Sequence, residues 1–145
     1  MKRAVAVLFA GWCCLVGLSG APAQSRVDAS FDTSRTVTLK GQICSAYLAG
    51  PRSYVYVVVK LDGRAETWKL EFPPPNRMPQ GVSQDDFKTG NSVTVDVYPS
   101  KTASTPGPTQ TLFYSACPAS LANVLQSGYA TEITVPSGRR VRLGL

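Results

Sequence analysis

The stretch Tyr54–Phe72, which reads YVYVVVKLDGRAETWKLEF, decides the fold class of this chain. Its first half is rich in β-branched and aromatic residues, which favour a strand, and the Asp-Gly pair at 62–63 is a preferred two-residue hairpin turn. Residue types then alternate along the return strand. The expected core side of that strand is formed by Trp68, Leu70 and Phe72. The stretch therefore predicts a β-hairpin with one buried face.

Further strands are predicted on both sides of this hairpin, because residue types alternate or β-branched residues gather there. These strands cover 36–47, 92–98, 112–116, 131–135 and 139–143. In the first of them, Gly41 predicts a bend or bulge. Two short helical pieces are expected, at 83–88 and 118–126. We therefore expect an all-β chain, a small OB-like β-barrel of five or six strands with one or two short helices.

The first 23 residues have the three parts of a secretory signal peptide. Lys2 and Arg3 are followed by the apolar run Ala4–Leu18, and small residues precede Gln24. We expect cleavage after Ala23 and export to the periplasm or beyond, with no transmembrane anchor in the mature form. The alternative is a buried N-terminal helix.

The expected mature chain begins with a flexible lead-in at 24–34, because this segment is polar and unpatterned. A single β-barrel domain is expected at 35–145. Within it, turn-forming residues without an apolar pattern predict a loop at 99–108.

Two cysteines, Cys44 and Cys117, remain in the expected mature chain. In an oxidising compartment such a pair most often forms a disulfide, and two free thiols or a redox site are the alternatives. We expect Cys44 to point away from the barrel core, because it alternates with Leu39 and Ile43. A bridge would then tie the segment around Cys117 to the outside of the barrel.

The sequence contains no histidine, which removes the commonest general base and the commonest transition-metal ligand. Nucleophile motifs, calcium loops and phosphate loops are absent from it as well. We therefore expect no enzyme, no catalytic residue, no metal and no cofactor. An unrecognised hydrolase or metal enzyme is the weaker alternative.

The net charge of the chain is +6. Loss of Lys2 and Arg3 leaves 13 of the 15 basic residues against 9 acidic ones, a net charge of +4. This modest excess is compatible with anionic partners but requires none of them. We expect no nucleic acid partner, because the protein is expected to be exported.

Aromatic residues on the strands and a basic cluster near the C-terminus form the candidate binding surface, since OB barrels bind ligands with sheet and loop residues. The candidates are Arg52, Tyr54, Tyr56, Trp68, Arg139, Arg140 and Arg142. The alternatives are that the aromatic side chains pack in the core or at its rim, and that the arginines form a solvated edge that resists aggregation.

Short motifs follow one another along the chain: Ser30-Phe31-Asp32, Val37-Thr38-Leu39-Lys40-Gly41, the turn at Pro51, Trp68 with Glu71, Pro75-Asn76, Phe87-Lys88-x-Gly90, Val93-Thr94-Val95 and Val135-Pro136-Ser137-Gly138-Arg139. Together they resemble a family of small secreted proteobacterial proteins of unknown function. The resemblance implies a small OB-like β-barrel without an established catalytic activity.

The chain departs from that family at two places. Asp28-Ala29 stands where members usually carry a His-His pair, and Gly50-Pro51-Arg52-Ser53 stands where they tend to carry Asn-Pro-His-Ala. A metal site built on those histidines in relatives would be absent here. Relative to that family, the chain also carries an insertion at about 100–128, which holds Cys117.

These observations together predict an exported, non-catalytic envelope protein, a small binding module for a ligand or a partner protein. The alternative is an accessory or structural subunit that docks onto another envelope protein through its disulfide-tethered insertion.

Overall fold

A computed structural model describes residues 23–102, 117 and 126–144 of the chain. Strands dominate this part of the chain, with one α-helix and two short 3-10 helices. In chain order the elements are α1 (Ala23–Ser30), β1 (Val37–Ala49), β2 (Arg52–Leu61), β3 (Arg64–Phe72), η1 (Pro75–Arg77), η2 (Gln84–Phe87), β4 (Ser92–Pro99), β5 (Gln126–Thr134) and β6 (Arg140–Arg142).

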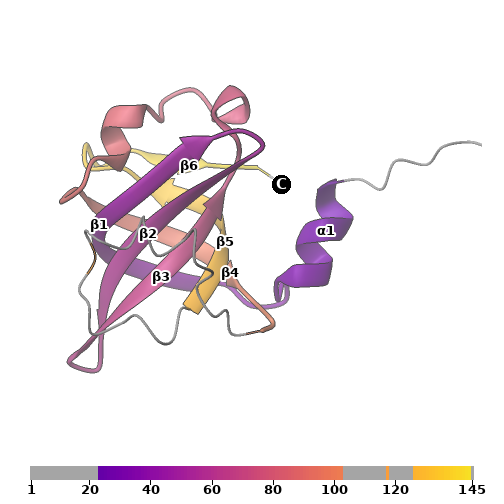
Figure 1. Ribbon diagram of the computed structural model, residues 1–145, viewed down its shortest axis with the longest axis horizontal. Helices are drawn as coiled ribbons and strands as arrows, with labels where there is room; N and C mark the ends of the chain where they lie inside the picture. The colour runs from indigo at the N-terminus through magenta and orange to yellow at the C-terminus, as the bar shows by residue number, and fades with distance from the viewer. Residues whose placement is uncertain (1–22, 103–116, 118–125, 145) are drawn as a thin grey trace, which may run out of the picture.

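Five strands close into a mixed barrel, in the order β3-β2-β1-β4-β5 (Figure 1). Neighbours in this order are antiparallel, and the barrel closes where β3 and β5 pair in parallel. Strand β6 lies outside the closed barrel and pairs with β5 alone. Closure leaves the barrel strands without free edges. The expected small OB-like β-barrel is confirmed.

Alternating side chains from each strand fill the barrel interior, as a period of two requires. The predicted core side of β3 is confirmed, since Trp68, Leu70 and Phe72 are all buried there. Their partners on β2 and β4 are Val55, Val57, Val59, Val93, Val95 and Val97. Such burial of branched and aromatic side chains is the main favourable contribution to folding.

The β2–β3 hairpin has the turn that the sequence predicts. Asp62 and Gly63 join the strands with positive φ angles of 50° and 77°. Both central residues of a type I′ turn need a positive φ, and its twist matches that of the flanking strands. The turn therefore fixes the register of the two strands, in which Leu61 pairs with Arg64 and Ser53 with Phe72.

Strand β1 pairs with β2 on one side and with β4 on the other, and Gly41 lies where the two pairings overlap. The bulge lies between Ile43 and Ser45, three residues after the position of the predicted bend or bulge. A Cβ on Gly41 would lie 2.2 Å from the carbonyl oxygen of Val58. The glycine is therefore required by a close backbone approach.

The segment predicted as a flexible lead-in contains a helix. Its sequence AQSRVDAS has no amphipathic pattern, and tertiary contacts hold it instead. Val27 and Phe31 are buried in a small cluster with Tyr129, whose ring lies 5.7 Å from that of Phe31. Figure 1 shows α1 beside the barrel, with the C-terminal end of the chain lying between them in this view.

The C-terminal boundary of the insertion predicted at 100–128 differs from the prediction. Strand β5 begins at Gln126, because residues 126–129 pair in parallel with β3. The last residues assigned to the insertion are thus part of the barrel. The strand predicted at 112–116 and all but the last residue of the helix predicted at 118–126 lie outside the described residues.

The predicted helical turn at 83–88 is confirmed as the 3-10 helix η2. The carboxylate of Asp86 accepts hydrogen bonds from the backbone N–H and the hydroxyl of Ser83, at 2.8 and 3.1 Å. These two hydrogen bonds from Ser83 to Asp86 fix the start of the turn. Phe87 then packs against Phe72 with ring centroids 5.3 Å apart, which anchors the turn on the barrel core.

Candidate ligand-binding groove

The outer face of the β2–β3 hairpin carries polar and aromatic side chains. Alternation places Arg52 and Tyr54 of β2 on this face, together with Lys69 and Glu71 of β3. Tyr54 pairs directly with Glu71. The Lys69 ammonium lies over the Tyr54 ring, 4.3 Å from its centroid, in a cation–π contact.

Glu71 connects this face to the N-terminal helix. Its carboxylate accepts a hydrogen bond from the guanidinium of Arg26 on α1, and the two form an ion pair. This hydrogen bond raises the pKa of Arg26 above its ordinary value. Tyr129 of β5 lies nearby, and burial, followed by the negative charge of Glu71, raises the pKa of its hydroxyl. Glu71 itself is only 8% exposed. A buried carboxylate that pairs with a guanidinium is thus held between α1, β3 and β5.

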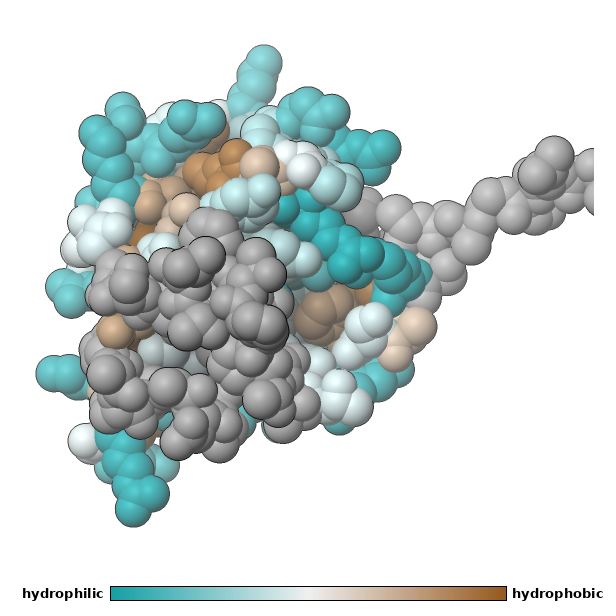
Figure 2. Space-filling view, in the orientation of Figure 1, coloured by the Kyte–Doolittle hydropathy of each residue, from teal (hydrophilic) through white to brown (hydrophobic). Residues whose placement is uncertain are grey.

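Two cavities flank Glu71. The larger, about 740 Å³, lies between α1, the β1–β2 turn, the segment after β3 and the end of the chain. The smaller, about 170 Å³, lies beside Tyr54 and Lys69. Both are lined by Arg52 and Glu71, and the two cavities together are named here the Glu71 groove. Figure 2 shows a band of hydrophilic residues where α1 approaches the barrel.

The Glu71 groove carries an excess of positive charge. Among the described residues that line it, Arg26, Arg52, Lys69 and Arg77 are basic and Glu71 alone is acidic. Burial lowers the pKa of Lys69, and the nearby Arg52 lowers it further, although Glu71 acts in the opposite direction. The folded protein therefore holds cations close together at a partly desolvated place.

The predicted disulfide joins Cys44 of β1 to Cys117, with their Cα atoms 5.2 Å apart. Both cysteines are buried with Tyr56 in a cluster separate from the barrel core. Cys44 thus faces outward from the barrel, as expected. The bridge holds the chain at residue 117 against the outer face of β1 and β2.

Tyr56 gives this cluster a testable pH dependence. Burial, and to a smaller extent Tyr54, raises the pKa of the Tyr56 hydroxyl from 10.0 to about 12. A pKa raised by folding contributes stability that is present below the unfolded value and is lost as the pH rises through the folded value. From about pH 9 to about pH 11, the free energy of unfolding should fall by about 1 kcal/mol relative to a Tyr56→Phe variant. Urea unfolding of both proteins at each pH measures this; parallel pH profiles would contradict it.

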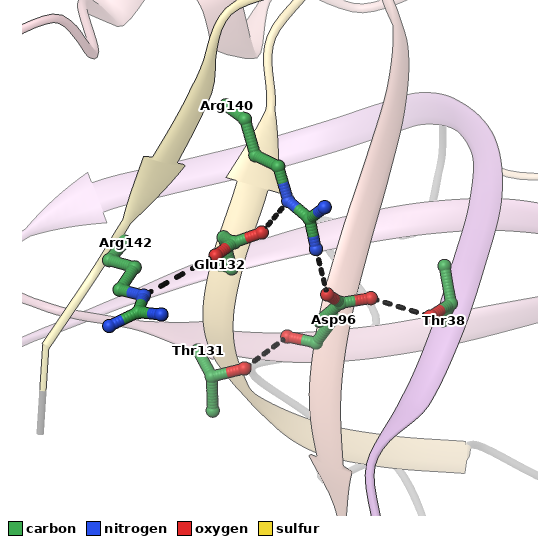
Figure 3. A network of polar contacts seen from close by, with 6 residues as sticks. All are labelled: Thr38, Asp96, Thr131, Glu132, Arg140 and Arg142. Carbon is green, nitrogen blue, oxygen red and sulfur yellow. Dashed lines mark hydrogen bonds and ion pairs between the residues drawn. The ribbon is translucent and has the colours of Figure 1, made fainter.

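The arginines of the predicted basic cluster are tied to neighbouring groups (Figure 3). Arg140 forms ion pairs with Glu132 and with Asp96, the latter at 3.1 Å, and Arg142 lies 3.6 Å from Glu132. Asp96 also accepts a hydrogen bond from Thr38 at 2.6 Å. This network links β1, β4, β5 and β6 across the outer face. Outside it, Arg139 donates a hydrogen bond to the carbonyl of Gly81.

This network predicts a small effect for Arg140→Ala. The arginine side chain is 67% exposed, so solvent screens its ion pairs and their contribution is small. We expect the free energy of unfolding to fall by about 0.5 kcal/mol, and the difference to shrink in high salt. Chemical denaturation at low and high salt measures both. A salt-independent loss several times larger would show that the network holds β6 more strongly than its exposure implies.

The seven predicted surface residues do not form one surface. Arg52 and Tyr54 lie in the Glu71 groove. Tyr56 is buried beside the disulfide, and Trp68 is buried in the barrel core because it faces inward on β3. The three C-terminal arginines make the contacts described above.

Sequence reasoning missed the other charged groove residues among those described, which are Arg26, Lys69, Glu71 and Arg77, and it also missed Tyr129. The alternation of β3 places Lys69 and Glu71 on the face opposite Trp68, and this signal could have found them. Nothing in the sequence pairs Arg26 with Glu71, which lies 45 residues away.

Within 23–102, 117 and 126–144, no three His, Cys, Asp or Glu side chains are grouped so that they could hold a metal ion. The helices of the same residues are too short or too polar to span a membrane.

The profile of a family of unknown function (DUF6152) matches residues 14–109. The chain belongs to this family. The resemblance to a family of unknown function is therefore confirmed. No curated protein and no solved structure matches the chain. In this DUF6152 protein the match includes α1 and β1 to β4, and so most of the residues that line the groove, whereas Cys117, β5 and β6 lie beyond it.

Proposed function

We propose that this DUF6152 protein is an exported, non-catalytic binding module of the bacterial envelope, and that its Glu71 groove holds a small ligand. The observation that carries the proposal is the groove itself. Its larger cavity of about 740 Å³ falls within the usual range for small-molecule sites, roughly 300–1,000 Å³. A few polar groups converge on it beside the aromatic ring of Tyr129 and a run of prolines, the mixture that ligand sites use.

Export is supported by the pattern of the first 23 residues and by the disulfide. A basic start, an apolar run and small residues before Gln24 are the parts of a secretory signal. Cys44 and Cys117 are paired, and disulfides persist in oxidising compartments such as the periplasm. The absence of histidine from the whole sequence favours binding over catalysis.

Blocking the groove without changing its charge tests this proposal. Gly50 lines the larger cavity, and a Cβ there would meet no atom within 4 Å. A Gly50→Trp variant therefore adds a large side chain to the groove, and the Cβ atom of that side chain clashes with no neighbouring atom. Leu61→Trp is the matched control, because Leu61 is exposed at the end of β2 that lies away from Gly50.

The probe is the small-molecule fraction of an envelope extract, added to the unreduced mature protein. A ligand that binds only the folded state raises the melting temperature. We expect the extract to raise it for the wild type and for Leu61→Trp but not for Gly50→Trp. Equal rises in all three proteins, or no rise in any, would overturn the proposal.

A further inference from the structure

We propose that the smaller cavity of the Glu71 groove binds an oxyanion of the ligand, a carboxylate or a phosphate, between Arg52 and Lys69. This inference rests on the proposed function and names the chemical class of its ligand. It follows from how the charges of the groove are partnered, from the way Lys69 is held and from the size of the cavity.

The only carboxylate among the described lining residues is already engaged. Glu71 pairs with Arg26 on α1, and its side chain is mostly buried. Neither Arg52 nor Lys69 makes an ion pair or hydrogen bond with a carboxylate in the part of the chain that the structure describes. Both side chains line the smaller cavity. Two cations therefore share this cavity with one carboxylate that a third cation already neutralises.

Lys69 is held in a defined position. Its ammonium lies 4.3 Å from the centre of the Tyr54 ring, and the strand pairing of Tyr54 with Glu71 fixes that ring on the same face. Holding a lysine half-buried beside Arg52 disfavours its charged form, as its lowered pKa records. A bound oxyanion would offset both the desolvation of Lys69 and the repulsion between Lys69 and Arg52. The binding free energy is therefore more favourable than at a site where each cation already has an anionic partner.

The smaller cavity has room for a single oxyanion group. A volume of about 170 Å³ suits one carboxylate or phosphate, and the adjoining 740 Å³ leaves room for the rest of a small molecule. The cavity also has the hydroxyl-bearing residues Ser100 and Ser127 in its lining, which is suited to oxygen atoms.

Titration of the unreduced, isotope-labelled protein with sodium phosphate, and separately with sodium malonate, tests the inference. Sodium chloride holds the ionic strength constant, and NMR signals of the Lys69 side chain and the Tyr54 ring report binding. We expect saturable shifts with at least one probe. Saturation with phosphate alone identifies the ligand group as a phosphate, and saturation with malonate alone identifies it as a carboxylate. Saturation with both shows that the site accepts either oxyanion. Saturation with neither would overturn the inference.

The hairpin supplies matched variants at its two ends. Lys69→Met and Arg52→Met remove the groove cations, whereas Lys60→Met and Arg64→Met remove exposed cations near the turn. Charged hydrogen bonds contribute enough that each groove variant should weaken probe binding about tenfold or more, with little change for the controls. Equal weakening in both sets would reveal non-specific attraction and overturn the inference. Backbone spectra of each variant confirm that it is folded.

The two proposals fail differently. If the envelope extract stabilises the wild type but not Gly50→Trp while neither probe saturates, the binding function stands and the oxyanion inference is wrong. If a probe saturates only with intact Arg52 and Lys69 but no extract stabilises the protein, the oxyanion site stands and the small-ligand function is wrong.

Discussion

Replacing Cys44 and Cys117 together with alanine is expected to lower the free energy of unfolding by about 4 kcal/mol. The bridge spans a sequence separation of 73 residues, so its loss frees a long loop of the unfolded chain. The cysteines also pack on Tyr56, and the variant loses part of that burial. Urea unfolding of the unreduced wild type and the double variant measures the difference.

The wild type treated with a reductant is the control for this prediction. It should unfold at a urea concentration well below that of the unreduced wild type and close to, or slightly above, that of the double variant, because both lack the bridge but only the double variant also loses the packing of the cysteines on Tyr56. If reduced and unreduced wild type instead unfold alike, the bridge contributes nothing to stability. The structural role of Cys117 on the outer face would then have to be abandoned.

The second large effect is expected at Gly41, where Gly41→Ala should destabilise the barrel by about 3 kcal/mol or more. The added Cβ would lie 2.2 Å from the carbonyl oxygen of Val58 and 2.8 Å from a methyl group of Val57. The nearer atom belongs to the backbone of β2, so relief requires β1 and β2 to separate. The melting temperature and urea midpoint of the variant measure the cost.

Gly50→Ala is the matched control for Gly41→Ala. A Cβ on Gly50 meets no atom within 4 Å, so the substitution should be nearly neutral, and it can stabilise slightly by restricting the unfolded chain. Equal destabilisation by both alanines would mean that the general loss of glycine flexibility, and not the contact with Val58, sets the effect.

The barrel strands were predictable because each has a strong local signal. The valines of β2 and the alternation of β3 fix which side chains face the core, and the Asp-Gly pair at 62–63 fixes the turn between them. The valines of β4 give the same kind of signal. Hydrophobic periodicity and turn chemistry act within a few residues, so a sequence displays them directly.

The long-range contacts carry no such signal. Helix α1 has a polar sequence without pattern and is held by Val27 and Phe31 on Tyr129, more than ninety positions further along the chain. The local sequence does not predict the start of β5, because its parallel partner β3 is also distant in sequence. Tertiary contacts override local propensity at both places.

The candidate site was predictable only in part for the same reason. Residue type and place on β2 predict Arg52 and Tyr54. The prediction of Trp68 as a surface residue is wrong, because its alternation with Lys69 and Glu71 places it on the inner face. The groove itself needs α1, the end of the chain and the Arg26–Glu71 ion pair, which only the fold brings together.

The surface of the hairpin favours a small ligand over a broad apolar partner. Among the described residues, the exposed large hydrophobic side chains are Tyr47 and Leu61, which lie on different strands. On the side of the molecule that Figure 2 presents, the hydrophobic residues that are visible lie in separate areas. Protein docking surfaces usually present a larger continuous apolar patch. The docking alternative predicts a second chain that purifies with this one.

The most direct test of the binding proposal is native mass spectrometry of the protein isolated from an envelope fraction without reduction. We predict a polypeptide that begins at Gln24, is two hydrogens lighter than its reduced form and carries a small-molecule adduct, which Leu61→Trp retains and Gly50→Trp loses. A bare chain in all three samples, or an adduct that Gly50→Trp retains, would contradict the assignment of the Glu71 groove as a ligand site.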